Sequence, residues 1–480
     1  MIYSKLVFFQ DKPMRLLSIC LLSFFLLACS NEPAPTRAQP VSVSQNALDY
    51  VGKNEAALVL TPAQQKHLFA EQQSRYFAPW QANFDRTSFN AFDDPLNIKA
   101  YENEQIRIFT HAHFWDAHNQ PYSEHWLDPT LAQMDLAHFP NANQPAITLR
   151  HTALRLLPFA APAYENPDRA GQGFPFDDLQ VDSIWAGTPV RILQHSTDQS
   201  WSLVATPWFF GWVQSADLAS VDADFIKAWQ AHPWVTPLAD DLPVMPFPKK
   251  SVTGKAAPMP QYTSVQPSLS PTNIYFKTKI GSFYPLLGET QNIDHILVPT
   301  RNEQGQAVLS EAFLPATQLT TAPFSATQSH FARVMNAMQG EPYRWGGLEG
   351  GRDCSSTMRD LFSVFGVWLP RSSGDQVRMG LSLSLANLTP TQRSTFIIKN
   401  AKPFATLLGY PGHITLYIGK IDDVPYVFQT VWGLHTYTFF GREGRAVIGK
   451  TVISPLNLGQ DHIDTQTQLD KPITMAFLFS

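Results

Sequence analysis

The sequence predicts an α+β protein of several domains: a helical N-terminal module, two small β-barrels and a C-terminal domain that mixes helices with a sheet. A chain of 480 residues has the length of two to four domains. Its composition, 44% hydrophobic with 12% aromatic residues, is typical of folded modules and not of a disordered chain. The pattern of apolar and polar residues also changes along the chain, from helical spacing to the short alternation that is typical of strands. These changes mark the boundaries between domains.

Residues 1–29 have the pattern of a secretory signal. After Met14 and Arg15 comes the apolar run "LLSICLLSFFLLA", which ends at Cys29. A basic start, an apolar stretch of this length and a small residue before the break favour a signal peptide over a membrane span. The chain can start at Met1 or at Met14, because the residues before Met14 add nothing that a signal needs.

Cys29, directly after "LLA", resembles the lipobox cysteine of bacterial lipoproteins. The alternative is an ordinary signal peptide in which Cys29 occurs by chance and carries no lipid. The resemblance implies a membrane anchor through lipid on Cys29. Ser30, where some lipoproteins have Asp, implies the outer membrane of a Gram-negative bacterium, facing the periplasm. Residues 30–55 are polar and rich in proline, so we expect a flexible tether.

The rest of the chain divides by pattern into five segments. "TPAQQKHLFAEQQSRYFAPW" predicts a helix that Thr61 caps, within a helical module at 56–148. Short alternating runs such as "TPVRILQHS" and "SWSLVATPWFFGWVQ" then predict a small β-barrel. A proline-rich connector and a second barrel with the hairpin loop "RNEQGQA" follow. The predicted ranges are 149–222 for the first barrel, 223–272 for the connector, 273–322 for the second barrel and 323–480 for the last domain.

Cys354 is the only cysteine left once Cys20 leaves with the signal and Cys29 carries lipid, so no internal disulfide is possible. It is either a buried small hydrophobe or a nucleophile. The apolar residues that follow it recur at helical spacing, with Asp353 placed to cap the helix and Gly366 to end it; they are Met358, Leu361, Phe362 and Phe365. The first turn of a helix favours the thiolate modestly, so a base is needed as well.

One histidine stands out in "GYPGHITLYIGKIDDVPYVFQTVWG". Alternation predicts two strands joined by a turn near residue 422, which brings positions 429–431 opposite His413. Gln429 then lies where it can bond the imidazole and fix its tautomer, as the third member of a catalytic triad does. His435 is the alternative third residue.

Three blocks in order, "PYRWGG…RDCSS", "LPRSSGDQ" and "GHITLYIG", resemble the NlpC/p60 superfamily of papain-like cell-wall cysteine peptidases. The first barrel resembles a bacterial SH3-like domain through its "GTPV", "WSLV" and "GWV" strands, and the second is interpreted as another. The N-terminal module is similar to the family's stabilising segment. The resemblance implies Cys354 as nucleophile, His413 as base and Gln429 as orienting group, and it implies substrate contacts for Tyr343, Asp353, Ser355 and Ser373.

The family resemblance further implies hydrolysis of the amide between γ-D-Glu and a diamino acid in peptidoglycan stem peptides or murein fragments. It also implies a requirement for a free N-terminal L-Ala, because the SH3-like module closes one end of the groove and supplies a carboxylate. Three acids are candidates for that carboxylate: Asp177, Asp178 and Asp182. The alternatives are a papain-like amidase or acyltransferase on another envelope amide, and a non-catalytic envelope-binding lipoprotein.

Other classes of function have little support. A net charge of −5 without a long basic run argues against nucleic acid as a partner. His111 and His113 can meet on one face of a strand, but no carboxylate or cysteine motif completes a metal site. "GGLEGG" lacks the Lys-Ser/Thr of a phosphate loop. We therefore expect no metal and no cofactor. The sequence leaves open the physiological role, the oligomeric state and which acid contacts substrate.

Overall fold

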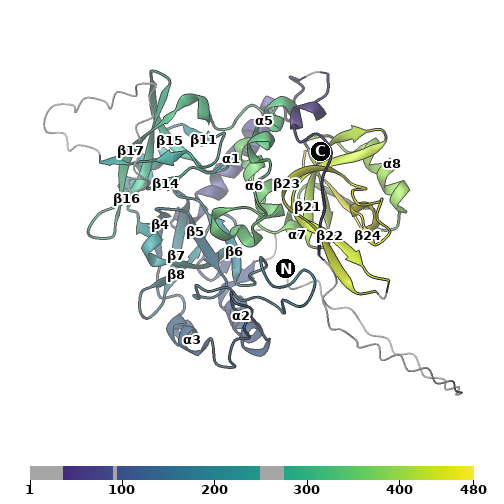
Figure 1. Cartoon of the computed structure of the whole chain (residues 1–480). Coiled ribbons are helices and arrows are strands. Elements are labelled where there is room, and N and C mark those ends of the chain that lie inside the picture. The colour runs from purple at the N-terminus through teal and green to yellow at the C-terminus, as the bar shows by residue number, and fades with distance from the viewer. Residues whose placement is uncertain (1–35, 54, 90–94, 249–274, 440, 480) are drawn as a thin grey trace, which may run out of the picture.

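The computed structural model describes residues 36–53, 55–89, 95–248, 275–439 and 441–479. The predicted signal at 1–29, the lipid site at Cys29 and Ser30 lie outside these residues, as does the part of the predicted connector from residue 249 to residue 272. The two small β-barrels and the N-terminal helices lie on one side of the molecule and the C-terminal sheet on the other, with α6 (Cys354–Val364) between them (Figure 1). No described helix combines the length and the apolar character that crossing a bilayer requires.

The C-terminal domain is built on a sheet with the strand order β1-β23-β22-β21-β20-β25-β19, and β24 pairs with β22. Its helices are α5 (Gln328–Met338), α6, α7 (Ser373–Gln376) and α8 (Pro390–Asn400). Its strands are β1 (Arg37–Ala38), β19 (Leu381–Ser384), β20 (Thr406–Tyr410), β21 (His413–Ile421), β22 (Val424–Tyr437), β23 (Glu443–Pro455), β24 (Thr465–Gln466) and β25 (Thr474–Phe477).

The helix predicted after Cys354 is confirmed as α6. Asp353 accepts from the backbone N–H of Ser356 and forms a capping box with it, which satisfies two N–H groups at the helix start. The apolar face is buried in the core of the domain, against α5 and the sheet. Gly366 adopts φ 81° just past the helix end, a conformation that glycine takes without strain.

The segment expected as a flexible tether is instead docked on the C-terminal domain wherever the structure describes it. Strand β1 runs parallel to β23, with Arg37 opposite Ala446, and Arg37 forms an ion pair of 2.6 Å with Asp464. Ala47 is fully buried in the core of that domain. The composition suggested a free chain, but edge-strand pairing uses backbone groups that every residue has.

The first barrel has the strand order β10-β4-β7-β8-β9-β5-β6. It includes residues 144–148, outside the expected range of 149–222, because β4 pairs with both β7 and β10. Its strands are β4 (Gln144–Thr148), β5 (Thr152–Arg155), β6 (Gln180–Ile184), β7 (Pro189–His195), β8 (Trp201–Ala205), β9 (Phe210–Gln214) and β10 (Leu218–Ser220).

The second barrel draws strands from the predicted connector. Its sheet has the order β13-β17-β16-β15-β11-β18, and β11 and β13 lie between residues 223 and 272. Helix α4 (Ala223–Gln230) begins that range. The strands are β11 (Trp234–Pro237), β13 (Phe247–Pro248), β15 (Tyr284–Thr290), β16 (Ile293–Arg301), β17 (Ala307–Pro315) and β18 (Leu319–Thr321).

The N-terminal module contributes α1 (Pro62–Tyr76), α2 (Ile98–His111) and α3 (Asp128–Met134). Helix α2 packs against the first barrel and brings a carboxylic acid into the shared core, where the Trp212 indole donates to Glu102 Oε2 at 2.8 Å. Burial raises the pKa of Glu102 to about 8, although the Trp212 hydrogen bond opposes this shift. The module is thus joined to the barrel by an acid that is protonated near neutral pH.

A buried network of arginine and acid side chains joins the first barrel to the C-terminal domain. Arg371 lies 2.9 Å from Asp182 of β6 and 2.7 Å from Asp353. Arg359 of α6 also pairs with Asp182 and bonds Asp360 at 2.9 Å. Burial raises the pKa of Asp182 despite its two guanidinium partners. The barrel is therefore fixed to the helix that carries Cys354.

Arg352 extends this network to the second barrel's connector. Its side chain is fully buried and pairs with Asp240 at 2.5 Å, with Glu341 at 2.7 Å and with Asp360 at 2.7 Å. Trp185 of the first barrel donates to Asp360 at 3.2 Å. Every arginine in the network thus has at least two carboxylate contacts, as buried charges require.

We predict that Glu102→Gln stabilises the protein at pH 8 more than at pH 5. An acid whose pKa is higher in the folded state costs stability as the pH rises from its unfolded value toward its folded value, by about 1.4 kcal/mol per pH unit. The unfolded value is about 4.3, and glutamine still accepts from Trp212. Urea unfolding at the two pH values measures the effect. The exposed Glu124→Gln is the control; an equal effect of Glu102→Gln at both pH values would contradict the prediction.

We predict that Asp182→Ala destabilises the folded protein by about 3–5 kcal/mol, because it leaves two buried guanidinium groups without their shared carboxylate. Chemical denaturation followed by tryptophan fluorescence measures the change. Asp168→Ala, at an exposed position of the same barrel, is the matched control. Similar unfolding midpoints for the two variants would show that the network does not hold the domains together.

Candidate active site

Cys354 is the first residue of α6, and its side chain is 4% exposed. The backbone N–H of Ile414 bonds its sulfur, so the thiol lies against the start of β21, beside His413. The two residues come from segments about sixty positions apart, and α6 packs on the sheet where β21 begins (Figure 1). The fold thus brings the predicted nucleophile and the predicted base to one place.

The hairpin expected near residue 422 is confirmed, with β21 and β22 joined at Asp422 and Asp423. It places Gln429 Oε1 at 2.7 Å from His413 Nε2. Because an amide oxygen only accepts, Nε2 carries the proton and Nδ1 is left as the basic nitrogen of the ring. This is the tautomer that a general base next to a thiol needs.

His435 lies away from this pair. Its Nδ1 is 2.5 Å from Glu443 of β23, and no described hydrogen bond joins it to His413 or Gln429. The geometry therefore favours Gln429 over His435 as the orienting residue. The register of the predicted hairpin favoured the same residue, but the sequence did not show that His435 pairs with Glu443.

Burial keeps the thiol and the imidazole neutral. It raises the pKa of Cys354 to about 12, with a further contribution from the Asp353 carboxylate, although backbone N–H groups and Arg371 oppose the shift. It lowers the pKa of His413 to about 4. Backbone N–H groups at the helix start do lower the pKa of Cys354, as expected, but desolvation outweighs them in the free protein.

Asp353 and Ser355, the predicted substrate contacts beside Cys354, are bound by the protein itself. Arg371 donates to Ser355 Oγ at 2.7 Å and to Asp353 Oδ2 at 2.7 Å, and the Gly346 N–H also donates to Asp353 at 3.1 Å. Burial opposes the ionisation of Asp353, yet Arg371 and the hydrogen bonds hold its pKa below the usual value. A substrate amine at Asp353 would share the carboxylate with Arg371.

Tyr343 and Ser373 are both buried, and Tyr343 lies near the thiol. The carboxylate of Asp353 and the thiol of Cys354 are among the causes that raise the pKa of Tyr343, after burial. Ser373 begins α7, which is tied to α6 because Gln376 donates to the Ser355 carbonyl at 2.8 Å. Asp353, Cys354 and Ser355 thus lie at the start of α6, His413 and Gln429 lie on β21 and β22, and Ser373 lies on α7, which is hydrogen-bonded to α6.

An aromatic cluster borders the site and spans two domains. Phe176 of the first barrel has its ring centroid 5.3 Å from that of Trp345, 5.8 Å from Trp432 and 6.3 Å from Tyr343. Trp345 and Tyr343 belong to the approach to the nucleophile and Trp432 to β22. The first barrel thus supplies one wall beside Tyr343.

The three acids suggested for substrate binding have different surroundings. Asp177 is fully buried and pairs with Arg155 at 2.5 Å. Asp182 is buried between Arg359 and Arg371. Asp178 is partly exposed. Two of the three carboxylates are therefore buried, and Asp178 is the more exposed one.

Sequence reasoning missed Gln468 and Ser454, which hold Gln429. The Gln468 Nε2 donates to Gln429 Oε1 at 2.7 Å, and Gln429 Nε2 donates to Ser454 Oγ at 2.6 Å. Gln468 belongs to the short turn at Gln468–Asp470, which has no periodicity to mark it. The partners of Arg371, which joins Asp182 to Asp353, were also not foreseen.

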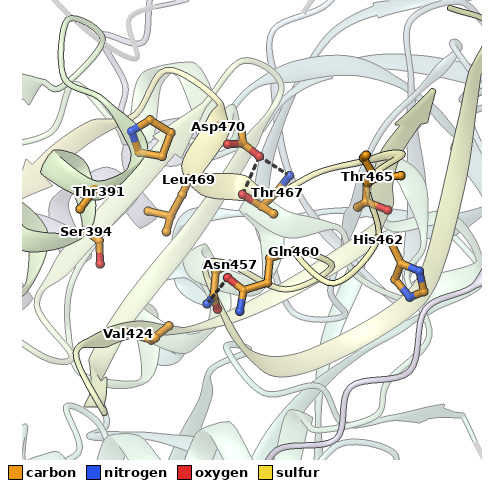
Figure 2. A pocket seen from close by; sticks show the side chains of 12 residues that line it. Thr391, Ser394, Val424, Asn457, Gln460, His462, Thr465, Thr467, Leu469 and Asp470 are labelled. Carbon is orange, nitrogen blue, oxygen red and sulfur yellow. Dashed lines mark hydrogen bonds between the residues drawn. The ribbon is translucent and has the colours of Figure 1, made fainter. Parts of the chain in front are cut away.

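No described group of His, Cys, Asp and Glu side chains has the arrangement of a metal site. His111 and His113 are exposed, and His111 lies at the end of α2, not in a strand. A pocket on the surface of the C-terminal domain is lined by residues of α8 and of the 457–470 segment (Figure 2). None of the predicted catalytic residues lines that pocket.

Three family models match the chain: the NLPC_P60 stabilising domain at residues 18–139, an SH3 domain of SH3b1 type at 162–214 and the NlpC/P60 family at 340–424. A curated γ-D-glutamyl-L-lysine dipeptidyl-peptidase from Bacillus subtilis (strain 168) is 35% identical over 81 residues. That match spans 17% of this chain and a quarter of the relative's length.

Among solved structures, an NlpC/P60 endopeptidase from Photobacterium damselae subsp. piscicida is similar over 92% of this chain and 99% of its own, with 25% identity and a TM-score of 0.81. An NlpC/P60 family protein from Bacillus cereus ATCC 10987 is similar over 70% of this chain and 100% of its own, with 15% identity and a TM-score of 0.44.

We predict that Gln429→Ala lowers kcat at least about a hundredfold toward a cleavable peptide amide, because the His413 ring loses the acceptor that fixes its tautomer. Gln429→Asn, with a shorter amide, should lose less. His435→Ala should have the smaller effect, and single-turnover kinetics compares the variants. A larger loss for His435→Ala than for Gln429→Ala would show that the orienting residue is His435.

Proposed function

Because the chain carries the stabilising, SH3 and NlpC/P60 domains of the NlpC/P60 family, whose peptidases are cysteine peptidases, we propose that it is an endopeptidase of peptidoglycan stem peptides. The scissile bond is the amide between γ-D-Glu and a diamino acid. The observation that carries the proposal is Cys354 at the start of α6 beside His413, whose Nε2 is held by Gln429. A peptidoglycan substrate agrees with the hydrolases that the chain resembles.

The neutral state of the pair suggests how the reaction starts. The Cys354 thiol transfers its proton to His413 Nδ1 as its sulfur attacks the amide carbonyl, so the ions form only when substrate is bound. Gln429 accepts from Nε2–H throughout and steadies the imidazolium. Backbone N–H groups at the start of α6 stabilise the oxyanion. The imidazolium then protonates the leaving amine, and water hydrolyses the thioester.

We propose further that the substrate needs a free N-terminal L-Ala. Phe176 of the first barrel lies against Tyr343 and Trp345, so we propose that the barrel closes the substrate site on that side and excludes a peptide that continues there. The candidate acceptors for the amine are Asp353, which lies next to the thiol and already binds Arg371, and Asp178, which is more exposed than Asp177 and Asp182.

We propose a cell-envelope location, with lipid on Cys29 as the anchor and the outer membrane of a Gram-negative bacterium, facing the periplasm, as the site. The support is the apolar run that ends in "LLAC" at residues 26–29. Globomycin treatment of cells followed by mass spectrometry of the mature N-terminus tests this location.

We predict that the purified protein cleaves L-Ala-γ-D-Glu-diaminopimelate into L-Ala-D-Glu and the diamino acid, as followed by liquid chromatography with mass spectrometry. The N-acetylated peptide should react at least about a hundredfold more slowly, and Cys354→Ala should abolish cleavage of both. Equal rates on both peptides would contradict the free-amine requirement. Turnover of a different envelope amide alone would favour the amidase or acyltransferase alternative, and full activity of Cys354→Ala would exclude the mechanism.

A further inference from the structure

Lys471 lies directly after the turn that supports the predicted triad. The side chain of Gln468, the first residue of this turn, bonds Gln429, and the Lys471 N–H donates to the Gln468 carbonyl at 3.3 Å. Asp470 closes the same turn by accepting from the backbone N–H and the hydroxyl of Thr467, both at 2.8 Å (Figure 2). The backbone at Lys471 is therefore fixed relative to His413.

The ammonium group of Lys471 has no anionic partner among the residues that the structure describes. No ion pair within 4.0 Å and no hydrogen bond of Nζ is present there, although the residue is partly buried. Burial lowers the pKa of Lys471 to about 8, and Arg445 contributes to this shift while Glu443 opposes it. A partly buried ammonium group that has no carboxylate within ion-pair distance can gain by binding an anion.

Glu443, the acid that opposes the pKa shift of Lys471, already pairs with other groups. Glu443 Oε1 lies 2.5 Å from His435 Nδ1 and 2.7 Å from Arg445 Nη1. Arg445 is in turn anchored to the first barrel, because it donates to the Ala170 carbonyl at 3.1 Å. Lys471 is therefore the surplus cation of a group that contains one carboxylate.

This surplus charge acts on the predicted base. Lys471 is among the groups that lower the pKa of His413, so it opposes the imidazolium that the proposed reaction must form. An anion that neutralises Lys471 removes this opposition when substrate is bound. Stem peptides of the proposed class carry free carboxylates on the D-Glu α-carbon and on the diamino acid.

We propose that Lys471 binds a free carboxylate of the stem peptide and is a specificity-determining residue beside the predicted triad. The proposal rests on the proposed function, since it takes its ligand from that substrate class. The shared chemistry is a carboxylate on an ammonium group; the carboxylate comes either from D-Glu or from the diamino acid, and the experiment distinguishes these two sources.

The test measures binding without turnover, by calorimetry on the Cys354→Ala protein with and without Lys471→Met. Three peptides are compared: L-Ala-γ-D-Glu-diaminopimelate, the same peptide with the D-Glu α-carboxyl amidated, and the same peptide with the diamino acid carboxyls amidated. Lys471→Met should weaken binding of the acid peptide by about tenfold or more. The amidated peptide that lacks the carboxylate bound by Lys471 should bind equally to the proteins with and without Lys471→Met. This thermodynamic cycle shows whether the carboxylate belongs to D-Glu or to the diamino acid.

Two variants control for indirect effects. Lys471→Arg keeps the charge and should restore most of the affinity, while Lys399→Met removes an exposed lysine from α8 and should change nothing. An equal loss for all three peptides, or no loss for any of them, would overturn the assignment. Wild-type cleavage of the acid peptide is measured in parallel. If the wild-type protein cleaves the acid peptide but Lys471→Met does not change the affinity for any of the three peptides, only this inference is refuted. If the acid peptide is neither cleaved nor bound, the proposed function is refuted as well.

Discussion

Burial of three guanidinium groups between the domains is the constraint on which the rest of the structure depends. Arg352, Arg359 and Arg371 have left water, and each such charge costs several kcal/mol unless carboxylates replace its hydration. The carboxylates come from both sides of the junction: Asp182 belongs to the first barrel and Asp353 precedes the nucleophile. The barrel and α6 therefore take up one relative position, the one in which these ion pairs close.

The same junction controls the chemistry of the site. Asp353 caps α6, neighbours the thiol and is held by Arg371, so the position and charge next to Cys354 depend on a residue that also binds the barrel. Its carboxylate and the dry surroundings keep the thiol protonated. A buried and neutral thiol is protected from oxidation, since the thiolate is the reactive form. Activation is then coupled to substrate, which supplies the group that the thiol attacks.

Local patterns predicted the parts of the site that depend on periodicity. The apolar spacing after Cys354 identified α6, and the alternation around His413 placed Gln429 within reach of the imidazole, because a hairpin turn fixes which residues face each other. The tether and the connector were misjudged for a common reason. Proline and polar residues there suggested free chain, but β1 and β11 are held by backbone hydrogen bonds to β23, β15 and β18, and these need no apolar pattern.

The sequence by itself determined the order of the domains, through changes of pattern along the chain. It also determined the helix that begins at Cys354 and placed Gln429 opposite His413, because both follow from spacing within a short segment. Only the tertiary structure decided which acid of the first barrel is bound to Arg371, which residues support Gln429 and where the charge of Lys471 lies. These contacts join residues far apart in the chain, and the choice among several acids or amides depends on burial and distance. Neither is encoded in any local pattern.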